Sequence, residues 1–292
     1  MISWPDSLVM DIARRKSVIF IGAGVSMNSV STSGSRPKNW ADFLLGAAEK
    51  INGNASLVSH VKKLVRNGDL TTACDIVKDE IGANAFCDFA RKEYLSPGFQ
   101  SADIHSHIES LDSRIVVTTN VDKIYDNMIQ QNTINPPIVK THTDNGLAEA
   151  VRLQERLLLK IHGTIDNPND MIFTRRDYIS ARRKNLEMYK VISALAITHT
   201  FLFLGCGLSD PDITLIFENY SNDFTYGRNH FFTATKKDCK RMEHVRVLEE
   251  TRNIKFLKYD QKDNHAELTD SLKRLADDVY TARSDLSTNS NW

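Results

Sequence analysis

Residues Arg114 to Asp126, RIVVTTNVDKIYD, change from a strand-like to a helix-like pattern. The β-branched run Ile115 to Thr119 has the composition of a buried strand. The run ends at Asn120, and an amphipathic helix begins near Asp122. An amide and a carboxylate therefore follow the end of a strand, which is the edge of an open α/β sheet where ligands bind.

Strand-like and helix-like segments alternate on both sides of this stretch. Such alternation predicts βαβ units, and hence an α/β, Rossmann-like, doubly wound parallel sheet of about six strands. We expect strands near residues 17–21, 138–140, 157–161, 201–204, 230–233 and 254–259, and a short extended piece at 171–174. We expect helices at residues 6–15, 122–131, 175–198 (broken near Arg183), 211–219, 237–250 and 264–282.

A long helical segment interrupts this alternation after the first strand. Between about residues 39 and 111, apolar residues recur at helical spacing and no strand is evident. We therefore predict a single domain over 1–283 with a helical insertion at 39–111. Residues 284–292 are polar and are expected to form a disordered tail.

The composition of the 292 residues is that of an ordinary globular protein. The zero formal net charge removes the simplest argument for direct nucleic-acid binding. No apolar run is long enough to span a membrane, and the first residues do not resemble a signal peptide, so we expect a cytoplasmic protein. The four cysteines form no C-x-x-C pair, which argues against a structural zinc site.

Two glycine turns follow strand ends. Gly22-Ala23-Gly24 follows the first strand in the geometry of a phosphate-binding turn, although a tight strand-to-loop turn would explain it equally well. The third glycine and the acidic residue of the dinucleotide fingerprint are missing. Gly205-Cys206-Gly207 follows a later strand, and Ser209 or Asp210 could simply cap the helix that starts at Pro211.

Histidines offer a candidate base and a less convincing pair. His162 follows the strand at 157–161, so it lies at the same predicted sheet edge as Asn120. His105 and His107 are two residues apart on a predicted helix and face different sides, so we expect surface residues there, not metal ligands.

Taken together, four motifs resemble the sirtuin superfamily, and most closely its bacterial sirtuin-like branch found in antiphage defence proteins. They are GAGVS at 22–26, TTNVD at 118–122, KIHG at 160–163 and FLGCGLSDPD at 203–212. The resemblance covers about residues 8 to 280. The segment IFTRRDY at 172–178 resembles that branch too, and we expect Asp177 and Tyr178 in it to be structural.

The resemblance implies an NAD+ site. By analogy with the family, Asn120 contacts the ribose and the attacking water, and His162 is the general base. Asp122 contacts the nicotinamide carboxamide. The remaining implied cofactor-binding residues are Gly22, Ala23, Gly24, Ser26, Gly205, Gly207 and Ser209.

Protein-deacetylating sirtuins carry a zinc module after the HG motif, and residues 164–200 contain no cysteine. The acyl-lysine cleft therefore lacks its usual wall, and water becomes the expected nucleophile. The resemblance thus implies an NAD+ glycohydrolase that depletes NAD+ in antiphage defence by abortive infection, without zinc. The alternatives are an NAD-dependent deacylase or ADP-ribosyltransferase, and a non-catalytic NAD- or ADP-ribose-binding assembly subunit.

Such an enzyme would need restraint in its own cell. Because the predicted domain uses nearly all of the sequence, we expect control through a homo-oligomer or a separate regulatory partner. Related defence systems pair such subunits with, for example, a HerA-like ATPase. The insertion at 39–111 is the element expected to act as a lid or an oligomer contact.

Overall fold

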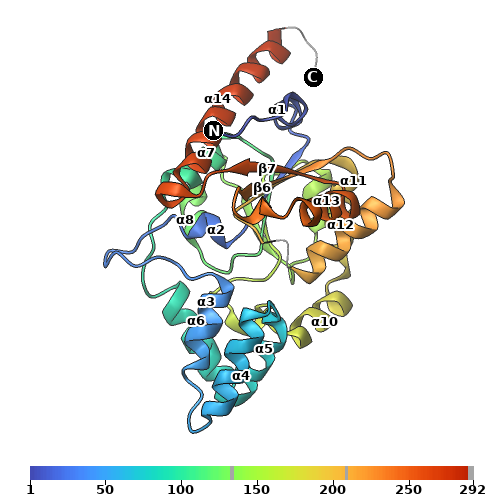
Figure 1. Ribbon diagram of the computed structural model, residues 1–292. Coiled ribbons are helices and arrows are strands. Elements are labelled where there is room, and N and C mark those ends of the chain that lie inside the picture. Colours follow the sequence, from blue (N-terminus) through green and yellow to red (C-terminus); the bar gives the residue numbers. More distant parts are fainter. Residues whose placement is uncertain (132–134, 208–209, 289–292) are drawn as a thin grey trace.

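Seven strands form one all-parallel sheet within the described residues of the computed structural model, which are 1–131, 135–207 and 210–288 (Figure 1). The order across the sheet is β3-β4-β2-β1-β5-β6-β7. The predicted doubly wound parallel sheet is confirmed, and its seven strands agree with the expectation of about six. The strands are β1 (Ser17–Ile21), β2 (Ile115–Thr118), β3 (Ile138–Thr141), β4 (Leu157–Lys160), β5 (Thr200–Leu204), β6 (His230–Thr235) and β7 (Ile254–Tyr259).

Helices cover both faces of the sheet because alternate strand residues point to opposite sides. Val18 and Phe20 of β1 face one hydrophobic core, whereas Ile19 and Ile21 face the other. The first core is closed by α9 (Leu147–Arg152), α11 (Leu186–Thr198), α12 (Pro211–Asp223) and α13 (Met242–Arg252). The second is closed by α1 (Asp6–Ala13), α7 (Asp103–Ser110), α8 (Ile124–Gln130) and α14 (Lys262–Thr288).

Four helices of the insertion form a bundle at one end of the molecule (Figure 1). They are α3 (Trp40–Ala48), α4 (Ala55–Arg66), α5 (Leu70–Ile81) and α6 (Ala83–Tyr94). Their core is separate from the two sheet cores, and Phe43 lies at its centre against Phe86, Phe89, Tyr94 and Phe173. The predicted insertion extended to residue 111, but α7 packs on the sheet face beside α14.

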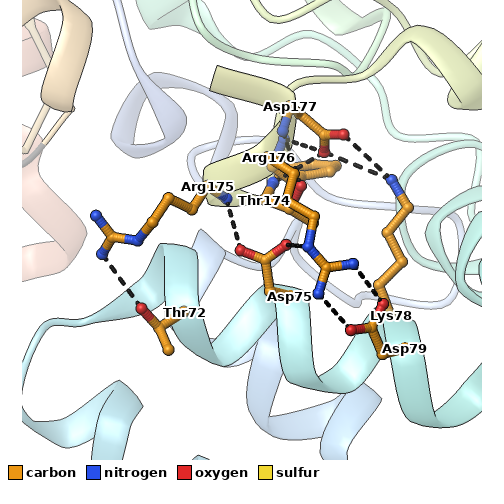
Figure 2. Close-up of polar contacts among 9 residues, drawn as sticks. Thr72, Asp75, Lys78, Asp79, Thr174, Arg175, Arg176 and Asp177 are labelled. Carbon is orange, nitrogen blue, oxygen red and sulfur yellow. Dashed lines mark hydrogen bonds and ion pairs between the residues drawn. The ribbon is translucent and has the colours of Figure 1, made fainter. Parts of the chain in front are cut away.

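A polar network attaches this bundle to the N-terminus of α10 (Arg175–Lys184), as Figure 2 shows. The main-chain amide of Arg175 donates to Asp75 of α5, and the guanidinium of Arg176 reaches both Asp75 and Asp79. Lys78 lies 3.5 Å from Asp177. Asp177 also forms a reciprocal cap with Thr174. The network therefore holds the segment that enters α10 directly against the insertion.

Several element boundaries differ from the predicted ones. The predicted helix 175–198 breaks at Asn185, close to the expected Arg183. Residues 171–174, expected to be a short extended piece, are not part of a strand, but the backbone is extended at Met171 and Thr174. A disordered tail was expected over residues 284–292, but α14 continues to Thr288, with Leu286 buried in the core that α14 closes. Residues 289–292 lie outside the described residues. The remaining short elements are α2 (Ala23–Ser26) and the 3-10 turns η1 (Pro168–Asp170) and η2 (Asp238–Lys240).

Candidate functional site

A cavity of about 710 Å³ opens at the carboxyl ends of the central strands. Ligand pockets usually have volumes of this order. The cavity lies where β1 separates the strands that follow it on either side, the position at which doubly wound sheets bind ligands. Nine of the residues predicted from the sequence line it: Gly22, Ala23, Gly24, Ser26, Asn120, Asp122, His162, Gly205 and Gly207. Ser209 lies outside the described residues.

The side chain of Asn120 is held by residues that follow β1. Its side-chain nitrogen Nδ2 donates to the carbonyl of Gly22 and to Ser26 Oγ, each at 2.9 Å. A carbonyl only accepts, so the amide must face Gly22 with its nitrogen. Both amide hydrogens are then used, and Oδ1 makes no hydrogen bond within the described part of the chain. Asn120 therefore presents an acceptor oxygen that can orient a water molecule or a hydroxyl group without titrating.

Asp122 belongs to the same hydrogen-bond network as Asn120. Ser26 Oγ donates to Asp122 Oδ2 at 2.8 Å, and the amide of Ile124 donates to Oδ1 at 3.0 Å. The main-chain carbonyl of Asp122 accepts from Lys160, whose ammonium lies 2.7 Å from Asp126. This ion pair is almost fully buried, so it fixes the turn between β2 and α8 that carries Asn120 and Asp122.

His162 contacts two residues that follow much later in the chain. Its Nε2 lies 3.0 Å from Oδ2 of Asp210 and 3.4 Å from the hydroxyl of Tyr178. Burial raises the pKa of the Asp210 carboxyl, but His162, the amide of Ile213 and Tyr178 together hold that pKa below its usual value. Asp210 is therefore a buried anion beside the predicted base.

The two glycine turns pack directly on each other. The amide of Gly24 donates to the carbonyl of Gly205 at 2.8 Å, and a Cβ at Gly22 would lie 2.7 Å from that same oxygen. Gly205 has φ +61°, and a Cβ there would lie 2.5 Å from the amide nitrogen of Val25. Turn-to-turn packing is thus sufficient to require glycine here, so their use by a phosphate remains a prediction.

Sequence reasoning missed two walls of the cavity. The insertion contributes Trp40 and Tyr94, beside Phe173. The ends of β6 and β7 contribute further lining residues, among them Thr235, Asp238, Tyr259 and His265. Neither wall carries a local sequence signal, because these residues meet the motifs only after the sheet and the insertion have folded.

The surroundings of Tyr178 and His105 bear on two further expectations. Tyr178, expected to be structural, is buried and does not line the cavity, but its hydroxyl donates to Asp210 and lies 3.4 Å from Nε2 of His162. His105 was expected on the surface, but it is fully buried, because its side of α7 faces the core and its Nδ1 bonds the main chain of Ala102. Within residues 1–131, 135–207 and 210–288, no three His, Cys, Asp or Glu side chains gather as a metal site. Over the same ranges no helix is both long and apolar enough to cross a bilayer.

The family model described as "SIR2-like domain" matches residues 114–257. This segment of the chain is similar to a SIR2-like domain. The resemblance to the sirtuin superfamily is thereby confirmed, and three of the four motifs quoted above fall in the matched segment. The first motif, at 22–26, precedes it.

Curated bacterial relatives resemble the chain beyond the SIR2-like segment. The NAD(+) hydrolase ThsA of Bacillus cereus (strain MSX-D12) is 22% identical over 291 residues, 93% of this chain and 56% of that protein. The ThsA of Enterococcus faecium is 26% identical, over 70% of this chain and 40% of that protein. Defense-associated sirtuin 2 of Bacillus subtilis is 24% identical over 69% of this chain, but over 19% of its own length. The chain spans about half or less of these relatives.

Solved structures that resemble the chain include one described as "Structural Basis for the Mechanism and Regulation of Sir2 Enzymes". It superposes on 96% of this chain and 100% of its own, with 15% identity and a TM-score of 0.45.

Proposed function

We propose that the chain is an NAD+ glycohydrolase that releases nicotinamide and ADP-ribose. The observation that carries the proposal is the meeting of Asn120 and His162 in one cavity at adjacent strand ends. An amide that can orient water and an imidazole that can take a proton suit hydrolysis of a glycosidic bond. Similarity to several proteins named NAD(+) hydrolase supports the same activity.

The reaction asks little covalent chemistry of the protein. The bond between C1′ of the ribose and the nicotinamide nitrogen breaks, and nicotinamide leaves with the bonding electrons as a neutral molecule. The oxygen of a water molecule, oriented by Asn120 Oδ1, bonds to C1′. His162 takes the proton, which then passes to solvent. Asp122, Ser26 and the two glycine turns are proposed to bind the dinucleotide in the rest of the cavity.

The test is incubation of the purified protein with NAD+ and identification of the products by mass spectrometry. Asn120→Ala and His162→Ala should each lower the rate by ~10²–10⁴-fold, the usual range for losing a positioning or acid–base group. Asn67→Ala and His60→Ala replace the same residue types at exposed positions of the insertion and should leave the rate unchanged. Absence of nicotinamide release from the wild type, alone or with an activating partner, would refute the proposal.

Addition of an acylated peptide separates this activity from the sirtuin reaction. Release of nicotinamide that depends on the peptide, with transfer of the acyl group, would indicate a deacylase. Labelling of a protein by ADP-ribose would indicate a transferase. Binding of NAD+ or ADP-ribose without turnover, with assembly altered by Asn120→Ala, would indicate a non-catalytic subunit.

We also propose that the activity serves antiphage defence in the cytoplasm. The similarity to Defense-associated sirtuin 2 supports this role. Bacteria that express the wild type, but not His162→Ala, should lose cellular NAD+ after phage infection. Regulation through a homo-oligomer or a separate protein, such as a HerA-like ATPase, is part of the proposal. Light scattering after size exclusion, with and without such a partner, measures it.

A further inference from the structure

Asp210 joins the N-terminus of α12 to the imidazole of His162. Its Oδ1 accepts from the amides of Asp212 and Ile213, at 3.0 and 2.8 Å. Its Oδ2 accepts from the hydroxyl of Tyr178 at 2.8 Å and lies 3.0 Å from Nε2 of His162. Each oxygen thus has two partners, so the carboxylate has only one orientation that satisfies all four.

Capping of α12 alone would not require this arrangement. A cap uses one side-chain oxygen, and Ser, Thr or Asn would serve as well as Asp. The second oxygen of Asp210 instead points to two buried rings. Tyr178 and His162 pack edge-to-face, with centroids 5.3 Å apart and an interplanar angle of 86°. The imidazole is therefore held both by a ring and by a carboxylate.

These contacts determine which nitrogen of His162 carries hydrogen. An ionised carboxylate only accepts hydrogen bonds, so the atom that faces Asp210 Oδ2 must be a donor. Tyr178 donates its hydroxyl hydrogen to the same oxygen, and burial raises the pKa of that hydroxyl well above its usual value. In the neutral imidazole, hydrogen must then be on Nε2 and the lone pair on Nδ1. Nδ1 makes no hydrogen bond with the described residues.

We propose that Asp210 and Tyr178 are positioning residues that hold His162 in the Nε2–H tautomer, so that Nδ1 is the nitrogen that accepts the proton during hydrolysis. The proposal rests on the NAD+ glycohydrolase function. As water bonds to C1′ and nicotinamide leaves, the proton passes to Nδ1. The imidazolium that forms is stabilised by Asp210 through Nε2–H until Nδ1 returns the proton to solvent.

The tautomer can be measured without NAD+. Long-range ¹H–¹⁵N spectra of protein labelled in its nine histidines distinguish a protonated from an unprotonated ring nitrogen, and His162→Gln identifies the signal. At a pH where the ring is neutral, the wild type should show hydrogen on Nε2. Hydrogen on Nδ1 in the wild type would overturn the proposal.

Two substitutions at position 210 separate the contact with His162 from the helix cap. In Asp210→Asn the amide oxygen is needed by the two helix amides, so the NH2 group must face His162 and should invert the tautomer. In Asp210→Ser the cap remains while the contact is lost, and a mixture of tautomers should appear. Tyr178→Phe should also give a mixture of tautomers, but with a smaller loss of the Nε2–H form than Asp210→Ser. Asn54→Ala removes the cap of α4, far from the cavity, and should leave the His162 signals unchanged.

Kinetics provide the second readout. In a serine protease triad, a wrong histidine tautomer lowers kcat by ~10⁴-fold, and a loss of ~10²–10⁴-fold in kcat is expected for Asp210→Asn with KM nearly unchanged. Inversion of the tautomer with full activity would overturn the role of Nδ1. A wild type that holds the Nε2–H tautomer but never releases nicotinamide would refute the glycohydrolase function while leaving the paired geometry intact.

Discussion

Two acid–base pairs have their basic residue at or just after the end of β4. These basic residues, Lys160 and His162, are two positions apart, but their surroundings differ. Lys160 and Asp126 are enclosed between β4 and α8, with side chains 1% and 5% exposed. His162 is buried and Asp210 is partly buried, with side chains 8% and 13% exposed, and both line the cavity. The enclosed pair leaves no room for a ligand, so it can only hold the turn between β2 and α8. The pair in the cavity is accessible to a bound molecule, with which we propose that His162 exchanges a proton. Access, more than burial, separates a structural pair from a chemical one.

The largest effect on stability is expected at the enclosed pair. Lys160→Ala leaves Asp126 buried and unpaired, which should lower the free energy of unfolding by ~3–5 kcal/mol. Urea unfolding followed by circular dichroism measures this loss. The double variant Lys160→Met/Asp126→Leu should recover most of it, because a well-packed apolar pair of similar volume removes the buried charge. If Lys160→Ala were no more destabilising than His162→Ala, the distinction between the two pairs would be lost.

A buried histidine without a carboxylate partner sharpens the comparison. His230 accepts from the amide of Phe201 among aromatic rings, and burial lowers its pKa to about 3. The unfolded chain binds this proton below the ordinary pKa of ~6.5, whereas the folded chain does not. Stability should therefore fall as the pH decreases from ~6.5 toward about 3, by up to ~1.4 kcal/mol per unit from this group.

Unfolding of His230→Gln across that pH range checks the linkage. The Gln side chain can still accept from the amide of Phe201. The slope of the free energy of unfolding against pH should decrease by the amount that corresponds to about one bound proton. His60→Gln on the exposed surface of α4 should keep the wild-type slope. An unchanged slope in His230→Gln would show that His230 does not carry the linkage.

The smallest effect is expected where an acid–base pair is accessible to water. Lys78 and Asp177 in Figure 2 are 3.5 Å apart, with side chains 25% and 23% exposed. Lys78→Met keeps the apolar stem and should lower the free energy of unfolding by only ~0.2–1 kcal/mol. That difference should shrink further at about 1 M salt, where screening is strong. A loss as large as that of Lys160→Ala would mean that this network, and not the enclosed pair, anchors the site.

The predicted site residues come together because of a general property of parallel sheets. Asn120, His162 and Gly22 each follow a strand, and all carboxyl ends of such a sheet lie at one edge. Strand composition and helix spacing were therefore enough to place them near one another. The same reasoning could not find Asp210 as the partner of His162, because the two are far apart in sequence and a helix cap explains Asp210 locally.

Other errors arose where a local pattern has two tertiary solutions. His105 and His107 lie on different sides of α7, and only packing on the sheet determines that His105 faces inward. Residues 284–288 are polar apart from Leu286, and contact of that one side chain with the core keeps them helical.

By itself, the sequence determined the doubly wound sheet, the insertion after β1 and the edge at which the motifs meet. These features depend on short-range periodicity and on the direction of the strands, which local residue types encode. Only the tertiary structure decided which side chains touch across that edge. Asp210 contacts His162, Lys160 forms a buried ion pair with Asp126, and the insertion forms one wall of the cavity. Such contacts depend on how separate elements pack, and a linear pattern does not specify those distances.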